Sequence, residues 1–272
     1  MNRLAAVATA AAVVAASLGF AVPAQAQGAI RIGLSGAFTG PAALASEWEK
    51  WGVDLAVEEA NAAGGLLGRK IEIVQVDNRC NPTEGANSGR KLVQEKVTAI
   101  IGAHCSSATL AMMPIILEAK IPMITGVSSS PRIGELSGSG GNPYMFRISP
   151  DDLRMATALT EYLGQTKRFR TVAVVGEDSD FGRGGAQAFI PLAKKAGIDI
   201  VSTDFAPQMS PDFTTLLTRV AQRKPDAIAL FMLSADQLNF TRTAMQMGLS
   251  IPYTGRAELA GKMLELIQAR GM

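Results

Sequence analysis

The hydrophobic positions of this chain form short runs, rich in β-branched residues, that alternate with segments of helical periodicity. Short apolar runs bounded by glycine or proline are typical of buried parallel strands, whereas apolar residues three and four apart are typical of amphipathic helices. In the first half of the chain the predicted strands and helices alternate along residues 30–36, 47–63, 70–76, 83–96, 98–103, 107–118 and 121–125. This alternation predicts a parallel α/β sheet flanked by helices.

The alternation pauses at "GELSGSGGNPYMFRISP", residues 134–150, where glycine, serine and proline cluster. A strand at 144–148 is then expected to open a second series. That series continues through 151–164, 171–178, 184–197, 199–205, 212–223, 226–232, 235–248 and 251–255. We therefore predict two α/β lobes, 27–142 and 143–250, with 251–272 crossing back toward the first.

Two tryptophans recur at helical spacing in the first predicted helix. Trp48 and Trp51 lie on one stripe with Leu55. Such a stripe more often faces a core than a ligand, so we expect both indoles to be buried.

The first 26 residues have the pattern of a secretory signal peptide. One positive charge, Arg3, precedes a long Ala/Val run, and the small residues Ala24 and Ala26 mark a cleavage site. The run is nearly long enough for a membrane anchor, but its alanine content and Pro23 favour cleavage and release into the periplasm. The first cysteine is Cys80, so none lies near the cleavage site to carry a lipid.

The charge balance argues against nucleic acid and anionic membranes as partners. Removal of Arg3 with the signal peptide leaves 25 basic against 24 acidic residues. The remaining 246 residues are too many for one ordinary α/β layer and suit two lobes.

Catalytic, metal-binding and nucleotide-binding signals are missing. His104 is the only histidine, so it would have to act as the base for Cys105 or Ser106. Adjacent side chains at a strand end point in different directions, so His104 would be poorly oriented for this role. No nucleophile elbow, dinucleotide fingerprint or phosphate-binding loop occurs. One histidine and two cysteines are too few for an ordinary zinc site. We expect no enzyme, no metal and no cofactor.

Small hydroxyl residues follow several of the predicted strands. Ser106 lies in the loop after the third strand and Ser128 in the loop after the fourth, at the sheet edge where open α/β folds bind ligands. Unpaired N–H groups and the positive end of a helix dipole favour a carboxylate there. Each serine alone could be an N-cap or turn residue, but two adjacent loops together favour a ligand site.

The two cysteines follow neighbouring strands. Cys80 ends "IEIVQVDNRC" and Cys105 ends "TAIIGAHC", so both lie at the same sheet edge. Cysteines of exported proteins usually pair, and we expect a disulfide here; two unpaired core thiols are the alternative.

Several segments resemble the leucine/isoleucine/valine-binding proteins, which are type I periplasmic solute-binding proteins of ABC importers. The resemblance is carried by "IRIGLSGAFTGP", "WGVDLAVEEANAAGGLLGRKIEIVQVDNRCNP", "IIGAHCSSAT" and "IPMITGVSSSP", and it extends over residues 28–258. Its most specific part is the pairing of a D-x-x-C-x-P segment with a C-S-S segment. The family resemblance also implies a Cys80–Cys105 disulfide.

The resemblance assigns roles to particular residues. Ser106, with Ser107 beside it, corresponds to the contact for the ligand carboxylate, and Ser128 and Ser129 to contacts from the next loop. Phe181 corresponds to an aromatic residue that the second lobe closes over the ligand.

The chain departs from the family pattern in three places. Ala45 stands where the family often has an aromatic residue, and Glu258 is the available acid for an α-ammonium, shifted by one position. Family members also continue well beyond "LELIQARGM", so the chain resembles a truncated member, whose first lobe would expose an apolar sheet edge.

These observations predict a monomeric periplasmic solute-binding protein that presents its closed form to a membrane permease. The expected ligand is a branched-chain amino acid. An aromatic or other carboxylic acid, or an amide, is the alternative ligand, and a ligand-sensing receptor domain is the alternative from another functional class.

Overall fold

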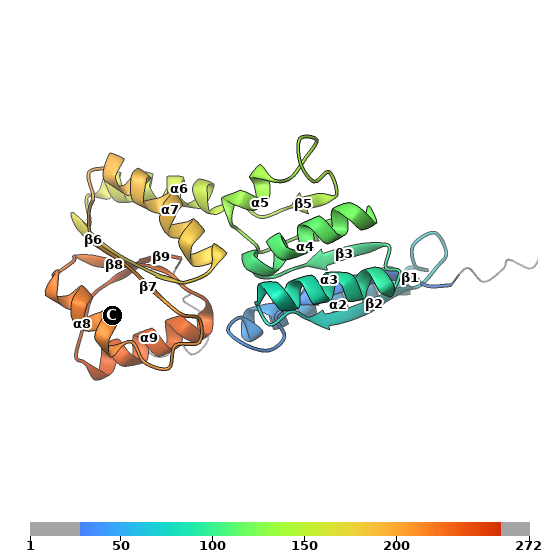
Figure 1. Ribbon diagram of the computed structural model, residues 1–272, viewed down its shortest axis with the longest axis horizontal. Helices are drawn as coiled ribbons and strands as arrows, with labels where there is room; N and C mark the ends of the chain where they lie inside the picture. Colours follow the sequence, from blue (N-terminus) through green and yellow to red (C-terminus); the bar gives the residue numbers. More distant parts are fainter. Residues whose placement is uncertain (1–27, 257–272) are drawn as a thin grey trace, which may run out of the picture.

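The computed structural model describes residues 28–256, which form two α/β lobes lying side by side (Figure 1). The first lobe contains five parallel strands in the order β2-β1-β3-β4-β5. Its elements are β1 (Ile30–Gly36), α2 (Ala43–Ala62), β2 (Ile71–Asp77), α3 (Pro82–Gln94), β3 (Ala99–Gly102), α4 (Ser106–Ala119), β4 (Met123–Thr125), α5 (Pro131–Glu135) and β5 (Met145–Arg147).

The second lobe contains four parallel strands in the order β7-β6-β8-β9. Its elements are α6 (Asp152–Thr166), β6 (Thr171–Glu177), α7 (Asp180–Lys195), β7 (Asp199–Ala206), α8 (Thr214–Gln222), β8 (Ala227–Phe231), α9 (Ser234–Gln246) and β9 (Tyr253–Gly255). The predicted α/β class with parallel sheets flanked by helices is confirmed.

The sheet of the second lobe is buried on both faces, which explains its continuous apolar strands. Val172 and Val174 pack with α6 and α7, whereas Ala173 and Val175 of the same strand pack with α8 and α9. Successive strand residues point to opposite faces, so a strand covered on both sides has no polar alternation.

The structure moves two of the predicted boundaries. β5 pairs with β4 in the first sheet, so the first lobe extends past residue 142 and the strand does not open the second series. β9 pairs with β8, so the second lobe extends past residue 250. Pairing partners are set by non-local contacts, which a local break in the pattern does not reveal. The predicted signal peptide and residues 257–272 lie outside the described residues.

The prediction that the two tryptophans are buried is wrong. Trp48 is 43% exposed and Trp51 58% exposed. The opposite side of α2 faces inward because polar contacts anchor it: the Ser46 hydroxyl accepts a hydrogen bond from the Ala37 N–H at 3.1 Å, and Glu49 pairs with His104. Helical spacing identified a stripe but not the direction in which it points.

Helix α7 begins four residues earlier than predicted. Ser179 is its N-cap, and the serine hydroxyl accepts a hydrogen bond from the Gly182 N–H at 3.2 Å. Asp180 in the first turn also suits the positive end of the helix dipole. The earlier start places Phe181 on the first turn of the helix, beside the first lobe. Within residues 28–256, no helix is both long and apolar enough to cross a membrane.

Candidate functional site

Loops that follow strands in both lobes line a cleft of about 440 Å³, including its solvent-open part. The lining residues of the first lobe are His104, Cys105, Ser106, Ser107, Val127, Ser128 and Ser129, and those of the second are Glu177, Ser179, Phe181, Gln208, Leu233 and Arg256.

The four serines named by the resemblance lie together in the first-lobe wall. Ser106 and Ser107 open helix α4, and Ser128 and Ser129 follow β4; all four are buried. The Ser106 hydroxyl accepts a hydrogen bond from the Ser130 N–H at 3.2 Å. This bond joins the two loops that carry the serines.

Ser128 adds a second connection between these loops. Its hydroxyl lies 2.6 Å from the carbonyl oxygen of Ala103 and 3.0 Å from that of His104. Thr109 of α4 reaches the same hydroxyl at 2.6 Å. The Ser128 side chain therefore fixes the shape of the wall as well as facing the cleft.

The two lobes touch at the N-termini of two helices. The Asp180 N–H of α7 donates a hydrogen bond to the Ser107 hydroxyl of α4 at 3.2 Å. The positive ends of both helix dipoles are therefore directed at the cleft, and this arrangement favours an anion.

The second-lobe wall contains an aromatic ring and a guanidinium group. Phe181 lines the cleft, and Arg256 Cζ lies 5.5 Å from the centre of its ring. Arg256 also donates a hydrogen bond to Asp152 Oδ1 at 2.8 Å. Ala45 is half-buried on α2 and is not among the lining residues. Glu258 lies outside the described residues.

Glu177 is a buried acid at the end of β6 and forms part of the second-lobe wall. Its carboxylate accepts hydrogen bonds from Gln208 Nε2 at 2.9 Å, from the Leu233 N–H at 3.0 Å and from the Ser179 hydroxyl. Burial raises the pKa of Glu177 above its ordinary value of 4.5, although these hydrogen bonds act in the opposite direction. Among the described residues Glu177 forms no ion pair, so a cation bound in the cleft would favour the ionised form of its carboxyl group.

The raised pKa of Glu177 gives a testable pH dependence. As the pH rises, the unfolded chain loses the Glu177 proton before the folded chain does. The stability that Glu177 contributes to the folded state is therefore fully present below about pH 4.5 and is lost as the pH rises through the raised pKa. We expect the unfolding free energy of Glu177→Gln, minus that of the unchanged protein, to increase with pH over this window. The increase is at most about 1.4 kcal/mol per pH unit, measured by urea denaturation.

Asp178, the next residue, is the matched control. A hydrogen bond from Arg183 lowers the pKa of Asp178, so its titration window lies below 3.8. The stability difference for Asp178→Asn should be constant above pH 5. A constant difference for Glu177→Gln as well would contradict the assignment of a raised pKa to Glu177.

Several cleft residues were not predicted as contacts. Glu177 is the last residue of β6, Gln208 and Leu233 lie in the loops after β7 and β8, and Arg256 follows β9 directly. The rule that ligand groups follow strand ends could have found all four, but it does not tell which residue of each loop turns inward. His104 was considered only as a catalytic base, although it lines the cleft.

The predicted disulfide is confirmed: Cys80 and Cys105 are bonded, with their Cα atoms 5.3 Å apart. Cys80 is 1% exposed and Cys105 6% exposed. Cys105 is the N-cap residue of α4 and lines the cleft, so the bridge anchors the start of this helix to the loop after β2.

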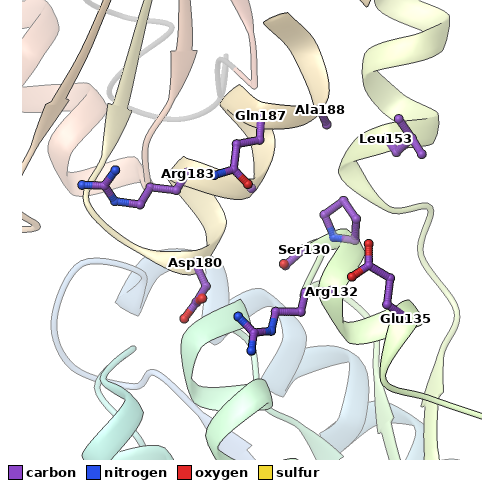
Figure 2. Close-up of a pocket in the computed structure, with 10 residues that line it drawn as sticks. Ser130, Arg132, Glu135, Leu153, Asp180, Arg183, Gln187 and Ala188 are labelled. Atoms are coloured by element: carbon purple, nitrogen blue, oxygen red, sulfur yellow. The ribbon is translucent and has the colours of Figure 1, made fainter. Parts of the chain in front are cut away.

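A larger, more open groove lies between α5 and α7 (Figure 2). Arg132 and Glu135 of α5 face Asp180 and Gln187 of α7 across it. The groove contains both signs of charge on partly exposed side chains. Buried hydroxyls, two helix N-termini and a buried carboxyl converge instead on the smaller cleft. Within residues 28–256, no group of three His, Cys, Asp or Glu side chains could hold a metal ion.

Residues 29–268 match the family model described as periplasmic binding protein. An amino acid binding protein of Pseudomonas aeruginosa is 30% identical over 220 residues, which make up 80% of this chain and 58% of that protein. The Leu/Ile/Val-binding protein of Citrobacter freundii is 27% identical over 238 residues, 88% of this chain and 64% of that protein. The chain thus spans about three fifths of the length of these two relatives.

Solved structures give the same result. A leucine-binding protein of Thermotoga maritima is similar with a TM-score of 0.77 and 26% identity, over 89% of this chain and 67% of that one. A similar structure from Streptococcus pneumoniae is a branched-chain amino acid transporter substrate-binding protein solved with isoleucine. Its TM-score is 0.76 and its identity 27%, over 88% of this chain and 67% of that one. These relatives bind solutes and are not enzymes, which confirms the corresponding prediction.

Proposed function

Because this chain belongs to the periplasmic binding protein family, we propose that it captures a small carboxylate-bearing ligand between its lobes and delivers it to the permease of an ABC importer. The observation that carries the proposal is the convergence of Ser106, Ser107 and Ser129 on one cleft with Glu177 and Phe181 of the other lobe. The protein acts in the periplasm as a monomer, and closure of the lobes generates the form that the permease binds.

We propose an amino acid as the ligand, with a branched-chain amino acid as the first candidate. The serines and the N-terminus of α4 receive the carboxylate. The ammonium needs an acid, because a buried unpaired cation is unfavourable. Glu177 lines the cleft and is the first candidate for the acid that pairs with the ammonium, and Glu258 is the second. The names of the relatives from Citrobacter and Thermotoga support this class of ligand.

Two alternatives rest on specific features. Arg256 lies beside Phe181 in the cleft and would suit a carboxylic acid without an amine, such as an aromatic acid. A ligand-sensing receptor domain could use the same fold and the same cleft. Neighbouring permease and ATPase genes would favour transport, whereas a neighbouring kinase gene would favour sensing.

Calorimetric titration with leucine, isoleucine and valine, and with their deaminated analogues, tests the proposal. We expect the amino acids to bind more tightly. Glu177→Gln or Glu258→Gln should weaken amino acid binding at least tenfold, or by about 1.4 kcal/mol, and should leave the analogues unaffected. Arg132→Gln, in the separate groove, is the control and should change neither.

The outcomes separate the candidate functions. Tighter binding of the deaminated acids would replace the amino acid by a simple carboxylic acid as ligand. Enzymatic turnover of any bound compound, or binding of none, would overturn the proposed function itself.

A further inference from the structure

A second cavity lies within the second lobe, next to the ligand cleft. It is bounded by α6, α7, β8 and the end of β9, and its apolar side chains are those of Met155, Ala156, Leu159, Phe189 and Phe231. The ligand cleft, by contrast, is lined mainly by polar side chains. The apolar surface that the cleft itself offers only sparsely is therefore present in the cavity beside it.

The walls of this cavity are held by the core of the second lobe. Ala156, Phe189 and Phe231 belong to one buried cluster, Leu159 packs against it, and the two phenylalanine rings lie 5.7 Å apart. Ala156 and Leu159 are three positions apart and so share one face of α6. The cavity is thus formed by packed side chains of the fold and does not depend on a bound ligand for its shape.

Arg256 connects the cavity to the ligand cleft, because it lines both. On the cleft side, its Cζ atom lies 5.5 Å from the centre of the Phe181 ring. On the cavity side, its Nη1 atom lies 2.8 Å from Asp152 Oδ1 and 3.1 Å from Met155 Sδ. The guanidinium group therefore lies at the boundary between the two spaces.

The charges at this boundary are paired. The Asp152 side chain is 1% exposed, the Arg256 side chain is 29% exposed, and the two form an ion pair. An apolar chain that passes beside this pair leaves no buried charge without its partner. Beyond the pair it reaches apolar walls, where burial is favoured over exposure to water.

We propose that this cavity receives the apolar side chain of the bound ligand, which enters from the cleft past Arg256. The inference rests on the proposed function and specifies its class of ligand. The carboxylate is bound by the serines of the first lobe, and the apolar chain extends into the second lobe. The protein therefore prefers acids with long, unbranched apolar chains to acids with short ones.

Two straight-chain series test the inference by calorimetry: the 2-amino acids from norvaline to 2-aminooctanoate, and the same acids without the amine, from pentanoate to octanoate. In at least one series we expect each added methylene to increase the affinity about fourfold, because it is buried in the cavity. The longest member should therefore bind at least tenfold more tightly than the shortest.

Variants that fill the cavity show whether it is the space in use. In Ala156→Leu the advantage of the longest acid should fall below twofold, while the affinity for the shortest acid changes less than twofold. Leu159→Phe fills the cavity from a second position and should have the same effect, so the test does not depend on the folding of one variant. Leu153→Phe is the control, because Leu153 lies on the same helix but is 49% exposed and lines the groove of Figure 2.

Three results would overturn the inference. The first is a longest acid that binds no more tightly than the shortest in both series of the unchanged protein. The second is an advantage of the longest acid that both filling variants leave unchanged. The third is equal weakening of all chain lengths by these variants, which would show that the cavity only supports the cleft wall. In each case, binding of norvaline or pentanoate would leave the proposed function intact, whereas failure of every acid to bind would reject both.

Discussion

Reduction of the Cys80–Cys105 bridge is expected to lower the free energy of unfolding by about 3.5 kcal/mol. The two cysteines are 25 residues apart, and the chain-entropy model gives this value for a loop of that size. For a protein of this length the loss corresponds to a fall in melting temperature of about 7–14 °C. The fold should persist, because the main hydrophobic clusters lie elsewhere in both lobes.

Thermal unfolding with and without a reducing agent measures this effect. The Cys80→Ala, Cys105→Ala double variant should melt near the temperature of the reduced protein and should not respond to the reducing agent. Two reactive thiols in the denatured, unreduced protein would contradict the pairing. Since Cys105 is the N-cap of α4, ligand affinity should fall together with stability.

Replacement of Gly182 by alanine is expected to destabilise the protein by about 3 kcal/mol and to disturb the second-lobe wall. A Cβ atom on Gly182 would lie 2.1 Å from the backbone oxygen of Glu177 and 2.8 Å from Glu177 Cγ. The close atoms include backbone, which cannot rotate away, so α7 must shift against the end of β6. The shift would displace both Glu177 and Phe181, and ligand binding should weaken with stability.

Gly184, two residues further along the same helix, is the matched control. Its nearest neighbour to an added Cβ is the Ser130 hydroxyl at 3.4 Å, an ordinary contact. Alanine there should be neutral or stabilising by up to about 1 kcal/mol, because alanine favours helix more than glycine does. Urea denaturation compares the stabilities of the two variants directly. Equal stabilities would show that the close approach of α7 to Glu177 leaves room for a side chain at position 182.

Much of the fold follows from local patterns in the sequence. The apolar strand runs and the helical periodicities predicted the alternation of strands and helices, since burial on both faces of a sheet requires near-continuous apolar strands. The positions of Cys80 and Cys105 after strands that end at the same sheet edge predicted their pairing, although the two strands are not neighbours as expected, because β1 lies between β2 and β3 in the sheet. The serines after β3 and β4 were predicted together for the same reason, because parallel strands end at one edge.

Other features depend on which distant segments meet. β5 follows a glycine-rich break but pairs with β4, because strand order is decided by contacts between remote residues. The stripe of Trp48 and Trp51 was visible in the sequence, yet Ser46 and Glu49 orient α2 so that the indoles face outward.

Some features of the cleft followed from the sequence, whereas others became visible only in the tertiary structure. The sequence by itself determined the strand-end loops, the small hydroxyls and the family. Only the tertiary structure brought Glu177, Gln208 and Leu233 together, and only it paired His104 with Glu49 across 55 residues. The physical reason is that periodicity reports the environment along one element, whereas a binding site is made by side chains from several elements whose directions are fixed by packing.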